Sequence, residues 1–173
     1  MKPLTILAAP INAVGHVNSV LGALKGFVSR GHRVIFILEE VFRGKAAAFG
    51  YEEHIIVFEK KKAEENPGDH IGARLVENKV LGHFSREELI GNIVKLIHNE
   101  DNYRDYKAFD DAIKETIKLY QPDLIYLDHC VVPPTLYYSG IPFINNASCT
   151  PIFFHDSDQI PPGGSGMFSS LTF

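Results

Sequence analysis

Two short apolar segments near the start of the chain, joined by an amphipathic one, constrain the fold more than any other feature. Residues 4–9 (LTILAA) and 33–38 (RVIFIL) are almost wholly apolar and of strand length, a pattern typical of strands covered on both faces. Between them, from His16 onward, apolar residues recur at helical spacing until Gly31, and glycine commonly ends a helix. Residues 4–38 therefore predict a strand, a helix and a second strand, the opening unit of a parallel sheet.

Strand and helix patterns continue to alternate along the 173-residue chain. The expected further elements are strands at 51–58, 124–128 and 143–145, helices at 41–49, from 74 to a break near 82–85, from the capping box at 85–88 to 97, and at 103–120, an exposed loop at 59–72, and a loop or short helix at 131–139. This order predicts an α/β fold, a Rossmann-like doubly wound parallel sheet flanked by helices. A single domain over 1–173 is expected from the length.

Composition and charge exclude several classes of function. The formal net charge is −4 and the pI about 6.0, and the basic run at 60–62 is followed at once by Glu64 and Glu65, so we expect no nucleic-acid partner. Cys130 and Cys149 match neither a disulfide framework nor a metal-binding spacing, so we expect no metal site and a reducing compartment. No apolar run reaches the roughly 18 residues that span a bilayer, and the first strand begins too early to follow a signal peptide. A cytoplasmic protein without a membrane span is therefore expected.

Two polar residues far apart in sequence are predicted to meet at one edge of the sheet. In doubly wound sheets, ligands bind beyond the carboxyl ends of the strands, and the usual strand order places the first strand beside the fourth. His16 follows the first strand and Asp128 ends the fourth, so the two side chains are expected within hydrogen-bonding distance. A carboxylate that orients an imidazole makes a general base. The alternative is that His16 only caps a helix and Asp128 only ends a strand.

The loop before His16 argues against nucleotide binding at this position. Residues 12–16 contain one glycine, Gly15, whereas a dinucleotide fingerprint requires several so that pyrophosphate can approach the helix. The chain also lacks the phosphate-loop lysine pattern and the G-x-S-x-G elbow of serine hydrolases. What remains is a base over a pocket, with Asn146 and Ser148 expected to contribute polar groups to the pocket wall.

Three motifs carry a resemblance to a known family. The segments GHVNSVLGALKGFVSRGHRV, QPDLIYLD and SGIPFI resemble the UDP-glycosyltransferases of the two-domain GT-B type, glycosyltransferase family 1. The resemblance covers essentially the whole chain and matches the amino-terminal, acceptor-binding half, itself a Rossmann-like domain. It implies that His16 is the catalytic base, that Asp128 orients it, and that a sugar is transferred with inversion to an acceptor hydroxyl.

The resemblance also implies ligands and a set of binding residues. The acceptor is expected to be a small hydrophobic molecule with a hydroxyl group, and the co-substrate a UDP-sugar, with UDP-glucose as the expected donor and no tightly bound cofactor. Ser148 is expected near the donor sugar or the acceptor, or only as a helix cap, and Phe84 in a variable wall of the acceptor pocket, or in the core. The expected acceptor-binding residues are Asn12, Val14, Gly15, Phe84, Cys130, Asn146 and Ser148.

Two departures from the family affect what is expected of this chain. It shows neither the secretory signal nor the membrane anchor of the animal enzymes, so it resembles the soluble types. It ends at Phe173, before the carboxyl-terminal domain that holds the nucleotide-sugar signature, so little or no transfer is expected from the chain alone. The alternatives are the acceptor half of a split enzyme, working with a donor-domain chain or as a homodimer, and a truncated isoform that binds a small molecule or a partner without catalysis.

Overall fold

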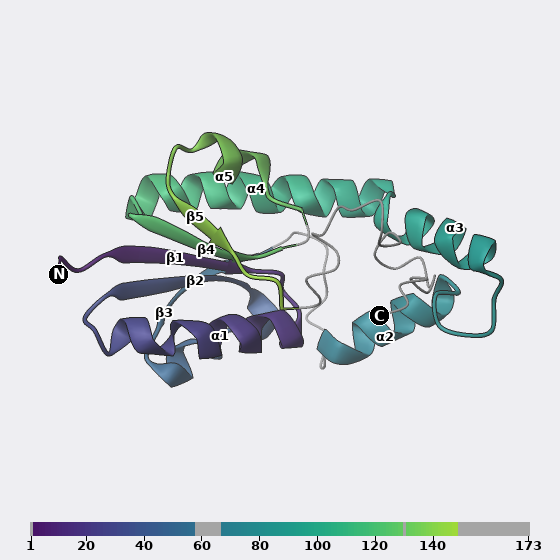
Figure 1. Cartoon of the computed structure of the whole chain (residues 1–173), viewed down its shortest axis with the longest axis horizontal. Helices are drawn as coiled ribbons and strands as arrows, with labels where there is room; N and C mark the ends of the chain where they lie inside the picture. Colours follow the sequence, from purple (N-terminus) through teal and green to yellow (C-terminus); the bar gives the residue numbers. More distant parts are fainter. Residues whose placement is uncertain (1, 58–66, 130, 149–173) are drawn as a thin grey trace, which may run out of the picture.

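A parallel β-sheet organises the molecule (Figure 1). The computed structural model describes residues 2–57, 67–129 and 131–148. Within these residues the sheet has five strands, all parallel, in the order β3-β2-β1-β4-β5. The strands are β1 (Thr5–Pro10), β2 (Arg33–Glu39), β3 (Glu52–Ile56), β4 (Leu124–Asp128) and β5 (Phe143–Asn145). The chain reverses its direction of travel between β1 and β4, so the predicted doubly wound α/β fold is confirmed.

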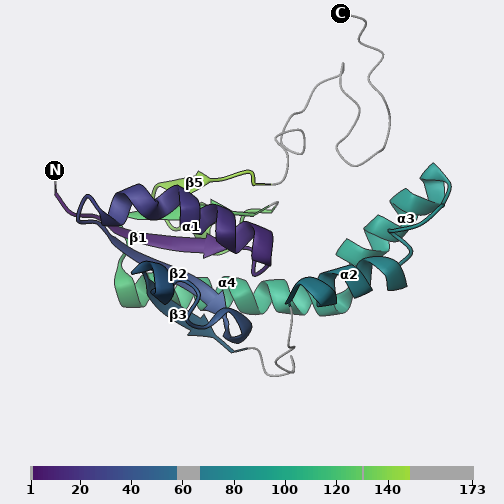
Figure 2. The same ribbon diagram turned by 90° about the horizontal axis from the view of Figure 1, so that it is seen from below.

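Helices cover both faces of the sheet, and Figure 2 shows α1 and α4 on opposite sides of it. Another pair, α2 and α3, lies beyond the carboxyl end of the strands in both views (Figures 1 and 2). The helices are α1 (Val14–Val28), α2 (Pro67–Glu77), α3 (Arg86–Ile97), α4 (Glu100–Tyr120) and α5 (Pro134–Tyr138), with short 3₁₀ turns η1 (Glu40–Phe42) and η2 (Ala47–Phe49). The arrangement leaves the carboxyl edge of the sheet bordered by α2, α3 and the start of α4.

Alternation along β1 divides the core into two layers. Ile6 and Ala8 pack toward α1, whereas Leu7 and Ala9 pack toward α4, and all four side chains are fully buried. Successive side chains of a strand point to opposite faces, so a strand buried on both sides must be apolar throughout. The apolar character of residues 4–9 therefore follows from their central place in the sheet.

Two helices begin earlier than the sequence indicates. The first was expected from His16, but α1 starts at Val14, so His16 lies in its first turn. Helix α4 was expected from Tyr103 but starts at Glu100, because the side chain of Asn99 accepts a hydrogen bond of 2.9 Å from the backbone N–H of Asn102. The gap expected between the helices ending at 97 and beginning at 103 therefore contains the cap, Asn99, and the first turn of the longest helix in the described part of the chain.

Other expected boundaries were partly wrong. The loop predicted over 59–72 gives way to α2 at Pro67, because a proline fits the first turn of a helix, where its missing N–H is not needed; residues 58–66 lie outside the described residues. The helix predicted over 41–49 consists of the two 3₁₀ turns instead. The capping box is confirmed, since Ser85 and Glu88 each accept a hydrogen bond from the other's backbone N–H, at 3.2 and 2.9 Å.

Stability should depend on the α4 face of the core. Ile113 of α4 is fully buried against the sheet, so we expect Ile113→Ala to lower the free energy of unfolding by about 3 kcal/mol, measured by urea denaturation. Ile90→Ala, in α3 at 43% exposure, is the matched control and should change that free energy by less than about 0.5 kcal/mol. Equal losses in the two variants would contradict the packing described for α4.

Candidate functional site

The site is built where β1 and β4 end side by side. Pro10 at the end of β1 is in register with Asp128 at the end of β4, and the backbone N–H of Ile11 donates to the Asp128 carbonyl at 3.1 Å. From that point the chain turns into the first turn of α1, which carries His16. The predicted proximity of His16 and Asp128 is confirmed, and it arises from strand order and not from sequence spacing.

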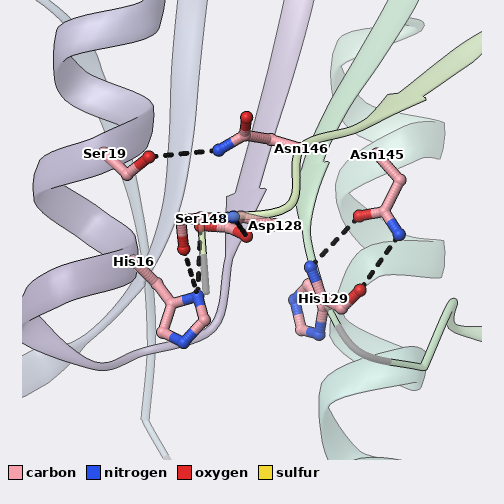
Figure 3. A network of polar contacts seen from close by, with 7 residues as sticks. All are labelled: His16, Ser19, Asp128, His129, Asn145, Asn146 and Ser148. Atoms are coloured by element: carbon pink, nitrogen blue, oxygen red, sulfur yellow. Dashed lines mark hydrogen bonds and ion pairs between the residues drawn. The ribbon is translucent and has the colours of Figure 1, made fainter. Parts of the chain in front are cut away.

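Three polar side chains converge at this edge (Figure 3). The Nδ1 atom of His16 lies 3.1 Å from Oδ2 of Asp128 and 3.0 Å from Oγ of Ser148. The backbone N–H of Ser148 donates to the other carboxylate oxygen, Oδ1, at 3.2 Å. Both oxygens of Asp128 therefore face groups that hold it, and its side chain is only 2% exposed.

The carboxylate determines where the imidazole carries its proton. A buried carboxylate accepts hydrogen bonds and cannot donate them, and apart from His16, Oδ2 of Asp128 has no hydrogen-bond partner among the described residues. The neutral form of His16 with hydrogen on Nδ1 satisfies this oxygen, whereas the other tautomer would set a lone pair against it. Nε2 is then the basic nitrogen, on the side of the ring away from Asp128 in Figure 3.

The last residue of β5 and the residue that follows it hold the edge together. The side chain of Asn145 accepts from the backbone N–H of His129 at 3.2 Å and donates to its carbonyl at 3.0 Å, so one amide binds both backbone groups. Asn146 donates to Oγ of Ser19 in α1 at 3.1 Å, and its own N–H donates to the Leu127 carbonyl at 2.7 Å. Figure 3 shows these contacts linking β4, β5 and α1. The predicted residue Asn146 therefore braces the site through α1.

A cavity of about 900 Å³ opens beside this edge. Its walls come from the loops after β1 and β4, from the end of β2, from α2, from the end of α3 with its connection to α4, and from the first half of α4. The lining residues are Ile11, Asn12, Glu39, Arg74, Leu75, Leu96, Ile97, His98, Asn99, Glu100, Asn102, Tyr103, Asp105, Tyr106, Phe109, His129 and Val131. Its size suits a small-molecule ligand.

The expected acceptor-binding residues are distributed unevenly around this cavity. Asn12 lines it, and its side-chain oxygen accepts from the backbone N–H of Glu39 at 2.7 Å, which ties the β1 loop to the end of β2. Ser148 contacts His16 and lies outside the cavity wall, as do Val14, Gly15 and Asn146. Phe84, 37% exposed in the α2–α3 connection, is neither a wall residue nor core, and Cys130 lies outside the described residues.

His129 is a site residue that the sequence reasoning missed. Its ring is 8% exposed, stacks on Phe109 with 5.1 Å between centroids, and lines the cavity. Burial lowers its pKa to about 4, repulsion from His16 adds to this, and Asp128 and the carbonyls of Pro10 and Ala9 oppose it. The available signal was its position directly after Asp128 at the end of a buried strand.

Metal and membrane features were searched in the same part of the chain. Among the described residues, no group of three or more His, Cys, Asp or Glu side chains is arranged to hold a metal ion. None of the helices in these residues combines the length and apolar character needed to cross a bilayer.

The fold and the polar edge together define a Rossmann-like α/β domain with its polar groups at the carboxyl ends of the strands. No protein-family model and no curated protein matches the chain. Among solved structures, the glycotransferase of kitacinnamycin aligns with 83% of this chain at 16% identity, with a TM-score of 0.53. This likeness shows a shared fold, and the chain spans 30% of that protein's length.

Two further solved structures give weaker alignments. CalG4, the calicheamicin glycosyltransferase, aligns with 74% of this chain and 27% of its own, at 21% identity and a TM-score of 0.46. The spinosyn rhamnosyltransferase SpnG, complexed with thymidine diphosphate, aligns with 72% of this chain and 29% of its own, at 12% identity and a TM-score of 0.43.

The tautomer of His16 should depend on Asp128. In the unsubstituted protein, long-range ¹H–¹⁵N spectra of neutral His16 should show hydrogen on Nδ1, because the carboxylate accepts from that nitrogen. Asp128→Asn should shift the population toward hydrogen on Nε2, since an amide can also donate. Ser148→Ala is the matched control and should leave the Nδ1–H form dominant, because a hydroxyl adapts to either tautomer. Dominant Nε2–H in the unsubstituted protein would contradict this geometry.

His129 should make the fold sensitive to acid. Its folded pKa of about 4 lies below the value near 6.5 of an unfolded histidine, so as pH falls the unfolded chain takes up the proton first. The stabilisation is therefore complete above about pH 6.5 and lost toward pH 4. Between pH 7 and 4.5 the protein should lose roughly 2.5 kcal/mol more unfolding free energy than His129→Phe, measured in urea. If the free energy of unfolding fell equally with pH in the two proteins, the lowered pKa of His129 would be refuted.

Proposed function

We propose that this chain is the acceptor-binding domain of a glycosyltransferase that uses a nucleotide sugar, with His16 as the general base. The observation that carries the proposal is the contact between Nδ1 of His16 and the buried carboxylate of Asp128, next to a cavity of small-molecule size. The motifs that resemble UDP-glycosyltransferases and the fold shared with a glycotransferase support it. The proposed co-substrate is a UDP-sugar, with UDP-glucose as the first donor to test.

The proposed reaction assigns one role to each member of the pair. Nε2 of His16 takes the proton of the acceptor hydroxyl while the acceptor oxygen attacks the anomeric carbon of the sugar. A bond forms between that oxygen and the anomeric carbon, and the bond from the carbon to the diphosphate oxygen breaks, leaving the electron pair on the nucleotide diphosphate. Asp128 stabilises the imidazolium that forms, which afterwards returns its proton to solvent. Attack opposite the leaving group inverts the anomeric centre.

The cavity is the proposed acceptor site. Apolar and aromatic side chains of α4 and of the end of α3 form much of its wall, which suits a hydrophobic molecule with few polar groups. Asn12 lies in this wall and is the predicted acceptor-binding residue that we assign to direct contact. Ser148 and Asn146 are proposed to act at the base, through the His16 contact and the α1 brace respectively.

The nucleotide sugar is proposed to bind elsewhere. The loop from Ile11 to His16 has one glycine and does not form the glycine-rich cradle that pyrophosphate requires. We therefore assign donor binding to a further domain, or to a partner chain that carries one. In either arrangement the donor must approach the carboxyl edge of the sheet, where Nε2 of His16 is directed away from Asp128.

A second candidate function is small-molecule binding without catalysis. One observation favours it: His16 is not among the residues that line the cavity, so a ligand could occupy the cavity without touching the base. In that case His16→Ala would bind ligands normally and no sugar transfer would be found.

The roles of the pair can be tested by activity. In the complete gene product, with UDP-glucose and 2-naphthol or related phenols, His16→Ala should lower kcat/KM by about 10²- to 10⁴-fold because the general base is lost. Asp128→Asn should also reduce kcat. His54→Phe is the matched control. His54 lies in β3 and contacts Tyr120 at the end of α4, away from the site, so the activity of this variant should be unchanged. Product would be followed by liquid chromatography with mass detection.

Two results would count against the proposal. Undiminished transfer in His16→Ala would remove the base assignment. Absence of transfer from both UDP- and TDP-sugars in the unsubstituted protein, together with ligand binding that survives His16→Ala, would favour the binding function instead.

A further inference from the structure

A second histidine at the same edge is not used by the base. His129 directly follows Asp128, is 8% exposed, and contributes to the cavity wall. Its Nε2 atom is buried and makes no hydrogen bond of ordinary geometry among the described residues, although the backbones of Pro10 and Ala9 lie close enough to raise the pKa of the ring slightly. A buried polar atom without a partner is costly to a fold, so a group that satisfies it on binding gains affinity.

The surroundings of His129 hold its ring in one position. Asn145 binds both backbone groups of the residue, and the ring stacks on Phe109 with 29° between the planes. Little rotational freedom is left to lose when a ligand arrives. Such a fixed polar group in a cavity wall sets the orientation of a ligand and selects among ligands.

His129 differs from His16 in its chemistry. Burial lowers the pKa of His129 to about 4, so near neutral pH its ring is uncharged and has one donor and one acceptor nitrogen. His16, by contrast, is partly exposed, and its Nδ1 atom lies 3.1 Å from the carboxylate of Asp128. One histidine therefore suits proton transfer, and the other suits hydrogen bonding to a neutral ligand.

The charges around the cavity restrict the ligand further. Among the described wall residues, the carboxylates are Glu39, Glu100 and Asp105, and the guanidinium is that of Arg74, which donates to Asn102 at 2.9 Å. The formal balance of these groups is negative. An anionic ligand would meet this potential unfavourably, whereas an uncharged or cationic one would not.

We propose that His129 is the specificity-determining residue of the cavity, hydrogen-bonding a hydroxyl or carbonyl group of a largely apolar, uncharged or cationic small molecule that packs beside Phe109. This inference rests on the proposed function, since it names the class of acceptor. It also places the polar end of that molecule at the same sheet edge as the His16–Asp128 pair, because the charges of both residues act on the His129 ring.

A matched series of naphthalene compounds tests the proposal. Binding of 2-naphthol and of 2-methylnaphthalene, which lacks the hydroxyl, would be measured by NMR titration of the 173-residue chain. His129→Phe keeps an aromatic ring beside Phe109 and removes the proposed hydrogen bond. It should therefore weaken the binding of 2-naphthol about tenfold and leave the binding of 2-methylnaphthalene unchanged. His129→Gln should recover part of the loss, and His54→Phe should bind both compounds as the unsubstituted protein does.

A second arm tests the charge preference. 2-Naphthoate should bind at least about tenfold more weakly than the 2-naphthylmethylammonium ion in the unsubstituted protein. Addition of 2-naphthol should shift the ring signals of His129, a reading that does not depend on any variant folding. Tighter binding of the anion, or a 2-naphthol complex that leaves these ring signals unmoved, would overturn the proposal.

The remaining outcomes separate this inference from the proposed function. If His129→Phe weakens both neutral compounds equally, or neither, or if none of the probes binds at millimolar concentration, the role of His129 fails, whatever His16 does in transfer assays. If 2-naphthol binding depends on His129 but no sugar transfer depends on His16, the binding role stands and the glycosyltransferase function falls.

Discussion

Burial of the Asp128 carboxylate is the constraint on which the rest of the site depends. The side chain is 2% exposed at the end of a central strand, where an unpaired charge would be strongly unfavourable. Its partners come from opposite ends of the sequence: His16 from the first turn of α1 and the backbone of Ser148 from beyond β5. Satisfying one carboxylate therefore requires the β1, β4 and β5 connections to be in place together, which couples the fold to the site.

The neighbouring histidines show how one edge supports two kinds of chemistry. His16 is partly exposed, at 17%, and faces the carboxylate, whereas His129 is turned into a less polar environment against Phe109. The same side chain therefore faces a carboxylate in one position and an aromatic ring in the other, and in the second position burial lowers the pKa of His129 to about 4. A ligand in the cavity would meet His129 first, since His16 is outside the wall.

The cavity depends on elements that contribute little to the core. In α3, no residue of the helix is buried, yet its end and the following connection form one side of the cavity, opposite the loops after β1 and β4. A wall on such elements can change in sequence with little effect on the sheet, while His16 and Asp128 are held at the ends of the central strands and the start of α1.

Local patterns in the sequence determined the elements and much of their order. Apolar runs, helical spacing and the Ser85 capping box identify strands and helices because these signals act between residues close in the chain. The proximity of His16 and Asp128 was then inferred from the strand order that is usual in doubly wound sheets. That inference used the predicted fold and no local signal in the sequence. The helix start at Glu100 was missed because the Asn99 cap depends on the geometry of the first turn, and the start at Val14 was missed because α1 begins without any side-chain cap.

Only the tertiary structure decided which polar groups share an environment. Nothing in the sequence indicates that Asn145 binds the backbone of His129, or that the ring of His129 stacks on a residue of α4, because these contacts join segments 16 or more residues apart. The same holds for the cavity, whose wall collects residues from five stretches of the chain that lie together only in the folded protein. Burial and electrostatics are properties of the assembled surroundings, and so the sequence by itself determined the pairing of His16 with Asp128, through the strand order that it predicts, while the fold decided the environment of the second histidine.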